Sequence, residues 1–418
     1  RDVKLTYFYQ SQHREGLRAK DMVEVLGRRN PHLHVRTVDP DKQPTVADTY
    51  GVRIYNAAVL ETDGRRIQVV STDENQIALG ILRITREHTT TICFIEGHNE
   101  YPMENFEFHT HFEGVAGHGH GEGASAIVQM RFHGAGRLRR ALESLGYEAR
   151  KITPATLTAI PSDCAAVLDV NPRTTYLPGE SDVLTSYLAQ GGAAVLLYDL
   201  GFILEARLAA ALRRVGIVVE QDVVIDPLDH YSTDPEVVAV PVYERHPITR
   251  NIALTFFPGI RSLTLLAPPP GVTSTPLFLS SPQSYARGVQ EMAERRPGRE
   301  SAASSAIPAA GRRTLAAAVE GAWPGTDAGS KPFRMVVVGD GDFASNSFLP
   351  YMANSDLALS MVRWAIREEQ APTVAVRMPV PPLVLLTKSQ MQRIFLLIEV
   401  LLPLSVVAVG AVVWWRRR

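Results

Sequence analysis

Cysteine is scarce in this sequence. Cys93 and Cys164 are the only two, and each lies within an apolar run. No Cys-x-x-Cys pair is present, which excludes the thiol chemistry that such a pair activates. We therefore expect two small buried hydrophobic side chains at these positions, in preference to a disulfide or a nucleophile.

An excess of charge of either sign is also absent. The 418 residues carry 43 basic and 44 acidic side chains, for a formal net charge of −1. Nucleic-acid-binding proteins present a basic patch, so this balance excludes a nucleic-acid partner. With 45% hydrophobic residues the chain can bury a core, and its length predicts two or three domains.

No signal peptide is visible, and residue 1 is an arginine. If the soluble part is exported, the exporting segment either has been removed or lies upstream of residue 1. Whether a membrane helix precedes residue 1 stays open.

Long apolar runs are missing until the carboxyl end. Residues 394–415 contain one ionisable side chain, Glu399, and are followed by three arginines. About 20 apolar residues cross a hydrocarbon core, so this run predicts one transmembrane helix, in preference to a buried core helix. The arginines indicate a cytoplasmic carboxyl terminus in the inner membrane, with the bulk of the chain periplasmic. Glu399 and Pro403 are unusual in lipid, and we expect them to contact another membrane protein.

The first 80 residues alternate strand and helix patterns. Strand-like runs at Val3–Tyr9 and Leu33–Val38 flank a helical stripe. Asp63-Gly64 then joins two further strands, because a type I′ hairpin turn needs φ > 0 at both central residues. This succession resembles a thioredoxin-like domain over residues 1–80. Tyr9-Gln10-Ser11-Gln12 stands where the Cys-x-x-Cys of such a domain would be, so we expect a binding or spacer module.

Residues 88–370 carry a longer alternation, which predicts an α/β domain with a parallel sheet. The continuous apolar run Ala193–Tyr198 is typical of a strand covered on both faces. Residues 281–330 are rich in Ser, Ala, Gly, Pro and Arg, and we expect most of them to form a loose surface insertion. Residues 371–393 are predicted to be a juxtamembrane linker.

The motif Gly339-Asp340-Gly341-Asp342-Phe343-Ala344 follows an apolar strand and matches G-x-G-x-x-A. A dinucleotide fingerprint belongs at the first strand–helix turn, and two carboxylates would repel a pyrophosphate. We expect a turn in which Asp340 and Asp342 accept hydrogen bonds from loop amides. A small ligand or a divalent cation is the alternative.

A histidine-rich stretch follows the first strand of the predicted sheet. Its four histidines are His109, His111, His118 and His120. Two His-x-His pairs in a glycine-rich loop can wrap a zinc or copper ion, because imidazole suits both metals. A flexible polar insertion whose histidines only titrate is the other interpretation.

Glu96, His98 and Glu100 follow the same strand, at the edge where open α/β sheets bind ligands. A hydrolytic triad would also need a nucleophile on a strand–helix elbow. The best elbow offers Tyr198-Asp199-Leu200-Gly201, which contains no Ser or Cys. We therefore expect ligand binding here, with Asp340 and Asp342, and no catalysis.

Several blocks together carry a resemblance to a known family. They are Val3–Phe8, Val38–Asp41, Ile92–Glu100, Val336–Phe343, and the last apolar run with Pro403, Gly410 and Trp414 before the arginines. The chain resembles the GldG-like auxiliary subunits of ABC transporters, first tied to gliding motility, over nearly its whole length. Members look like a thioredoxin-like module followed by a flavodoxin-like domain similar to class I glutamine amidotransferases (GIFT-like), without the Cys–His–Glu machinery.

The resemblance implies a non-catalytic, extracytoplasmic accessory subunit, anchored in the membrane and partnered with an ABC permease and its cytoplasmic ATPase. No cofactor is implied. The chain departs from the family in lacking an amino-terminal membrane helix and in carrying the histidine-rich stretch. The alternative function is a periplasmic protein that binds a transition metal through residues 109–120. The transported substrate, the direction of transport and the oligomeric state stay open.

Overall fold

The computed structural model describes residues 1–107, 134–231, 234–289, 308–326, 329–370 and 395–417. The chain divides into two units. The first contains an amino-terminal four-stranded sheet and a large nine-stranded sheet, and the second contains the carboxyl-terminal helix.

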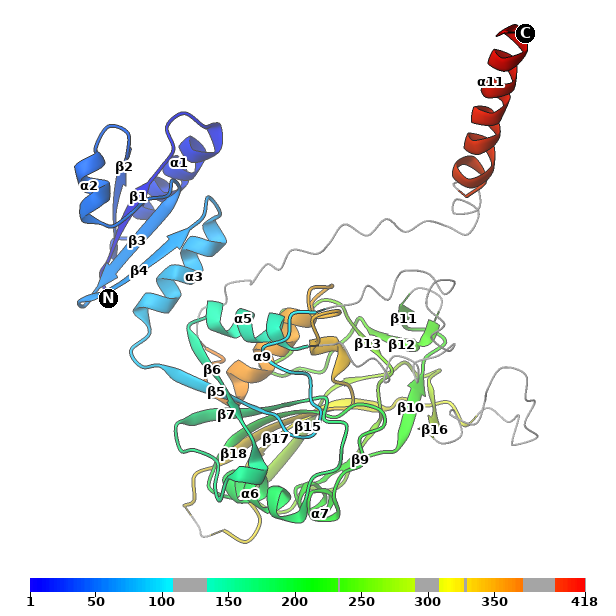
Figure 1. Ribbon diagram of the computed structural model, residues 1–418. Coiled ribbons are helices and arrows are strands. Elements are labelled where there is room, and N and C mark those ends of the chain that lie inside the picture. Colours follow the sequence, from blue (N-terminus) through cyan, green and yellow to red (C-terminus); the bar gives the residue numbers. More distant parts are fainter. Residues whose placement is uncertain (108–133, 232–233, 290–307, 327–328, 371–394, 418) are drawn as a thin grey trace. The chain divides into compact units, whose positions relative to one another are not determined.

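The amino-terminal region has the predicted strand, helix, strand, short helix and hairpin, and a further helix that was not predicted follows them (Figure 1). These are β1 (Val3–Phe8), α1 (Arg14–Arg29), β2 (Leu33–Val38), α2 (Pro44–Thr49), β3 (Ala57–Thr62), β4 (Arg65–Val70) and α3 (Glu74–Thr85). Strands run in the order β2-β1-β3-β4, with β1 and β2 parallel and the others antiparallel. Asp63 and Gly64 have φ of 47° and 74°, which confirms the predicted two-residue hairpin turn.

Five parallel strands form one half of the large sheet. In chain order they are β5 (Thr90–Ile95), β6 (Tyr147–Ile152), β7 (Cys164–Val170), β8 (Ala193–Leu197) and β18 (Phe333–Val338). Their order in the sheet is β6-β5-β7-β8-β18, so the first strand lies between the second and the third. This is the 2-1-3-4-5 order of flavodoxin-like sheets.

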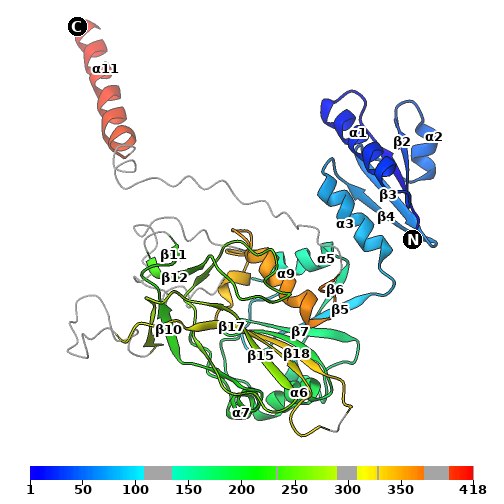
Figure 2. The same cartoon turned by 180° about the vertical axis from the view of Figure 1, so that it is seen from behind.

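Helices cover both faces of this parallel half. α5 (Gly136–Ser144) and α9 (Asn354–Ala365) pack on one face, and α6 (Pro178–Ala189) and α7 (Ala206–Arg214) pack on the other (Figures 1 and 2). Successive residues of β8 point alternately into the two cores, Val195 with α9 and Leu196 with α6. All five β8 residues are buried, which confirms the prediction made from their continuous apolar run.

The other half of the sheet is not parallel, so the prediction of a parallel sheet is wrong there. β17 (Thr314–Gly321) runs antiparallel to β18, and β14 (Leu263–Leu265) and β15 (Val272–Leu279) both pair antiparallel with β17. β9 (Ile217–Val219) pairs antiparallel with β14. The sheet is therefore mixed.

The predicted loose insertion is also wrong for the part that contains β17. Its residues 315–319 are buried within the large sheet. The run Leu-Ala-Ala-Ala-Val was not recognised as a strand, because the surrounding sequence is rich in small residues that are typical of loops. Small side chains nevertheless fit a strand that is covered by its neighbours. β16 (Tyr285–Gly288), from the same stretch, pairs with β10 (Asp222–Ile225). A three-stranded sheet of β11 (His230–Tyr231), β12 (Asp234–Val240) and β13 (Thr255–Pro258) completes the domain.

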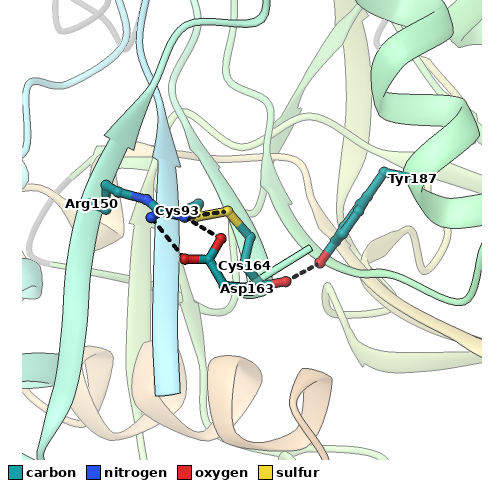
Figure 3. Close-up of a disulfide and its surroundings, with 5 residues drawn as sticks. All are labelled: Cys93, Arg150, Asp163, Cys164 and Tyr187. Carbon is teal, nitrogen blue, oxygen red and sulfur yellow. Dashed lines mark hydrogen bonds and ion pairs between the residues drawn. A yellow bond between two sulfur atoms is a disulfide. The ribbon is translucent and has the colours of Figure 1, made fainter. Parts of the chain in front are cut away.

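Cys93 and Cys164 form a disulfide, which corrects the expectation of two unpaired cysteines (Figure 3). The bond joins β5 to the neighbouring strand β7, where the two Cα atoms lie 5.6 Å apart. The Arg150 guanidinium lies 3.6 Å and 3.5 Å from the two sulfur atoms and pairs with Asp163. The bond was not predictable from the sequence, because a buried thiol and a buried half-cystine occupy the same kind of apolar strand position.

An ion pair joins the two ends of this domain. Arg86 precedes β5 and Glu368 follows α9, and the guanidinium donates to both carboxylate oxygens at 3.0 and 2.9 Å. Arg86 also donates to the Leu145 carbonyl, and the Tyr147 hydroxyl donates to Glu368. The chain therefore enters and leaves the domain at one point.

The carboxyl-terminal segment is helical in two pieces. A π-helical stretch, Leu396–Leu401, leads into α11 (Leu402–Arg417). Pro403 cannot donate a backbone hydrogen bond, and its ring crowds the carbonyl of Glu399, which accounts for the irregular geometry there. Among the described residues, no helix combines the length and the apolar character needed to cross a membrane. The transmembrane helix predicted over residues 394–415 is therefore not found within the described part of that run, residues 395–415.

Candidate functional site at the carboxyl edge of the large sheet

The parallel strands bring their carboxyl ends to one edge of the sheet. Glu96 to Glu100 follow β5, Asn171 follows β7, Asp199 lies two residues after β8, and Asp340 lies two residues after β18. Because β5 and β7 are the first and third strands of the fold, this edge includes its topological switch point, where such sheets hold ligands.

Three buried carboxyl groups meet at this edge. One oxygen from each of Asp199, Asp340 and Asp342 lies within 4.8 Å of the other two, and all three side chains are 0% exposed. The backbone amide of Asp342 donates to Asp340 Oδ1 at 2.7 Å, which confirms the prediction that Asp340 accepts from a loop amide. This set of three is called the acidic cluster below.

Neutral side chains donate to the acidic cluster. The Asn171 amide nitrogen donates to Asp199 Oδ2 at 3.1 Å and to Asp342 Oδ1 at 3.2 Å. The Tyr101 hydroxyl also donates to Asp342 Oδ1, and Arg173 donates to that hydroxyl at 3.1 Å. Asp340 Oδ2 and Asp342 Oδ2 have no hydrogen-bond partner among the described residues.

Burial makes these carboxylates difficult to ionise. Desolvation, followed by the charges of its neighbours, raises the pKa of Asp199 well above its usual value, and the same is true of Asp340. Desolvation also raises the pKa of Asp342, to about 6, against the favourable hydrogen bond from Tyr101 and the charge of Arg173. Like charges this close favour uptake of a proton or a cation.

The glycines of the Gly339–Ala344 motif permit close backbone packing. A Cβ atom on Gly339 would lie 2.2 Å from the carbonyl oxygen of Arg261, and one on Gly341 would lie 2.6 Å from the Asn171 side chain. The glycines thus bring Asp340 and Asp342 against neighbouring chain segments. Close packing of the backbone therefore explains the two glycines, and no bound pyrophosphate is needed to account for them.

A second buried group surrounds His98. Its Nδ1 lies 3.0 Å from Glu100 Oε1 and its Nε2 lies 2.8 Å from Glu180 Oε2. Burial disfavours the charged ring, but the bonds to the two carboxylates outweigh it and raise the pKa of His98. Because both ring nitrogens are engaged, this histidine holds the start of α6 against the end of β5.

Asp169, the last but one residue of β7, is connected to His98 through Tyr176. It is 0% exposed and accepts a hydrogen bond of 2.7 Å from the Tyr176 hydroxyl. The Tyr176 ring is tilted by 44° against the His98 ring, with the two ring centroids 4.1 Å apart. Burial, then the charge of Glu100, raises the pKa of Asp169 to about 8.

The structure brings together some of the predicted ligand-binding residues. His98 contacts Glu100, and Asp340 lies beside Asp342, whereas Glu96 turns away to pair with Lys151 at 3.3 Å. The predicted metal ligands His109, His111, His118 and His120 lie outside the described residues. The predicted membrane contacts Glu399 and Pro403 lie in the second unit and are exposed.

Sequence reasoning missed Asp199, Asn171 and Glu180 as members of these groups. Asp199 had a usable signal, because it follows a buried strand as Asp340 does. Glu180 had none at this edge, since it lies in the first turn of α6 and reaches His98 only through the packing of that helix.

The fold and this edge define an α/β protein with a mixed, flavodoxin-like sheet. Residues 89–366, more than half of the chain, match the family described as "ABC-type uncharacterized transport system". The chain belongs to this family and is an auxiliary component associated with an ABC-type transport system. No curated protein matches the chain.

Solved structures are similar to separate parts of the chain. The N-terminal domain of mmIFT52 is 16% identical, covers 66% of this chain and 97% of its own, and has a TM-score of 0.42. Thioredoxin of Fasciola hepatica is 20% identical over 20% of this chain and 82% of its own, with a TM-score of 0.19. A mutant thioredoxin of Halobacterium salinarum NRC-1 is 29% identical over 21% and 78%, with a TM-score of 0.19.

Proposed function

We propose that the chain is a non-catalytic, extracytoplasmic accessory subunit of an ABC transporter of the GldG-like type. It holds the large α/β domain outside the cytoplasm, attached to the inner membrane, where it works with a permease and its cytoplasmic ATPase. The observation that carries the proposal is membership of an ABC transport family over residues 89–366.

The disulfide supports the extracytoplasmic part of the proposal. Cys93 and Cys164 are the only cysteines of the chain, and they are bonded to each other. Structural disulfides persist in the periplasm and outside cells, whereas cytosolic thiols are kept reduced.

The hydrogen bonds, ion pairs and burial of the strand-end residues support a role without catalysis. His98 is engaged at both ring nitrogens, so neither is available to abstract a proton from a substrate. The acidic cluster is fully buried, and Glu96 is paired with Lys151. None of these groups is placed to act on a bound substrate, which supports recognition or mechanical coupling as the work of the domain.

The carboxyl-terminal segment supports attachment to the membrane. Its described side chains include Phe395, Leu402 and Trp415, which are 62%, 62% and 77% exposed. Exposed apolar surface of this kind marks a site that lipid or another protein covers. Glu399 and Pro403 lie within it, where we propose contact with the permease.

The test is mass spectrometry of proteins that co-purify with the full-length chain from native membranes in mild detergent. We expect a permease and an ATPase in amounts comparable to the chain. Glu399→Leu should lower their recovery, whereas Glu15→Leu, an exposed glutamate of α1, serves as the control. Recovery of the chain without transporter subunits would contradict the proposal.

A separate measurement addresses location. Because both cysteines are buried, thiols are alkylated under denaturing conditions immediately after cell lysis, before any reductant is added. This step should leave Cys93 and Cys164 unlabelled, and later reduction should expose both. Labelling without reduction would show that the disulfide is absent in the cell and would remove the support for an extracytoplasmic location.

A further inference from the structure

We propose that Asp199, Asp340 and Asp342 form a calcium-binding site at the carboxyl edge of the large sheet. The three carboxylates come from the ends of the neighbouring strands β8 and β18, which fixes their positions. The site lies inside the α/β domain and is independent of the carboxyl-terminal segment.

The spacing of the oxygens fits one calcium ion. Ca²⁺ binds oxygens at about 2.3–2.6 Å, so two oxygens on opposite sides of the ion lie about 4.6–5.2 Å apart. The three carboxylate oxygens of the acidic cluster all lie within 4.8 Å of one another. This upper limit is compatible with one ion shared by the three carboxylates.

Orphaned oxygens are the second observation that points to a cation. Asp340 Oδ2 and Asp342 Oδ2 are buried and have no hydrogen-bond donor among the described residues. A buried acceptor without a donor costs free energy, and a carboxylate costs more than a neutral group. The Asn171 and Tyr101 donors reach Asp342 Oδ1 and Asp199 Oδ2, so they orient these carboxylates and leave Asp340 Oδ2 and Asp342 Oδ2 for the ion. Both oxygens of Asp199 accept a hydrogen bond, from Asn171 and from the Leu200 amide, so Asp199 would bind the ion through a remaining lone pair.

The donor set selects the kind of cation. Three carboxylates offer only oxygen, which suits hard cations, whereas zinc and copper favour imidazole or thiolate. Mg²⁺ demands near-ideal octahedral geometry at about 2.0–2.1 Å and usually keeps several waters, which a fully buried cluster disfavours. Calcium tolerates irregular geometry and is the best match.

Two arginines near the cluster, the buried Arg261 and the half-buried Arg173, do not replace a cation. Arg261 Nη1 donates to the backbone carbonyls of Asp199 and Phe202, and its Nε donates to the Glu220 carbonyl. Arg173 donates to the Tyr101 hydroxyl, and its charge only partly offsets the repulsion among the carboxyl groups.

The experiment uses the full chain, stripped of metal with a chelator, and thermal unfolding in CaCl₂ or MgCl₂. We expect calcium at tenfold excess over its dissociation constant to raise the unfolding temperature by about 2 °C. Magnesium at the same concentration should have less effect. Calcium concentrations should extend past about 1 mM, the weak end of known protein sites.

Asp340→Asn is the decisive variant, because it removes one ligand charge and relieves repulsion in the metal-free protein. It should lose the calcium shift, while Asp163→Asn, which changes an exposed carboxylate of the same domain, should keep it. If Asp340→Asn fails to fold, Asp342→Asn is compared with the native chain by equilibrium dialysis against radioactive calcium.

An equal calcium shift in Asp340→Asn and the native chain, or no shift in the native chain, would overturn the assignment. Binding of calcium by native protein and not by either cluster variant would support it. The measurement needs no transporter, so its failure would leave the proposed accessory role intact, and failure of the co-purification would leave the calcium site intact.

Discussion

Cys93 and Cys164 join two neighbouring parallel strands, β5 and β7, through a disulfide that spans 71 residues of sequence. The chain between them includes α5 and β6, so the bond fixes one complete strand–helix–strand crossover. A cross-link of this span restricts the unfolded chain strongly.

We expect replacement of both cysteines by serine to lower the free energy of unfolding by about 4 kcal/mol, the chain-entropy value for a loop of this length. Urea unfolding of the native and double-serine proteins measures it. Adding a reductant should weaken the native protein and leave the double-serine variant unchanged. A native protein that is indifferent to reductant would contradict the prediction.

Asp169 should make stability depend on pH. Burial raises its pKa to about 8, so the folded state retains a proton that the unfolded state loses near its ordinary pKa of about 4. The resulting stabilisation is complete below the unfolded pKa and is lost as pH rises through the folded pKa. The slope is about 1.4 kcal/mol per pH unit between those values.

Asp169→Asn should reduce the slope by about 1.4 kcal/mol per pH unit, which urea unfolding between about pH 5 and about pH 6 would reveal. The remaining slope belongs to Asp199 and Asp340, whose pKa values burial also raises. In that interval His98 is below its ordinary pKa and protonated in both states, so it adds little. Asp163→Asn is the matched control, because that carboxyl is exposed and Arg150 lowers its pKa. Identical slopes in the native chain and Asp169→Asn would refute the assignment.

Gly339→Ala should destabilise the domain by about 2–3 kcal/mol, because the new methyl group would meet the backbone of Arg261 at 2.2 Å. Gly179→Ala in the first turn of α6 meets nothing within 4 Å and should be neutral or stabilising by up to about 1 kcal/mol. Thermal or urea unfolding compares the two. Equal effects would remove the backbone-packing explanation of the motif.

Ala317→Glu tests the buried position of β17. Ala317 is 0% exposed, so an unpaired carboxylate there should cost about 4 kcal/mol or more. Ala310→Glu lies in the same Ala-rich stretch but at an exposed residue, and it should change stability by less than about 0.5 kcal/mol. A tolerated Ala317→Glu would restore the interpretation of the stretch as a loose insertion.

Local patterns in the sequence predicted the parts of the fold that local chemistry determines. The Asp63-Gly64 turn needs a left-handed backbone, which these two residue types adopt readily. The unbroken apolar run of β8 indicates burial on both faces of the strand. The position of β17 was not predictable in this way. Its place and direction beside β18 follow from pairing between distant segments, and its alanines carry little strand signal.

In the candidate site, too, contacts between sequence neighbours were predictable, whereas contacts between distant segments were not. His98 and Glu100 are neighbours in sequence, so their contact follows from one tight turn after β5. The acidic cluster needs Asp199 and Asp340 to be placed by two strands that are adjacent only in the folded sheet. The disulfide was missed for an equivalent reason, because Cys93 and Cys164 become partners only when β5 and β7 pair.

The pairing of Arg86 with Glu368 has a mechanical consequence. A pull transmitted along the chain between the amino-terminal sheet and the carboxyl-terminal helix reaches this ion pair before it reaches the hydrogen bonds of the large sheet. The ion pair therefore bears the force first, and the hydrogen bonds of the large sheet bear none until the ion pair breaks. The domain can therefore be pulled as a rigid body, and the force at which it begins to extend is set by the Arg86–Glu368 ion pair.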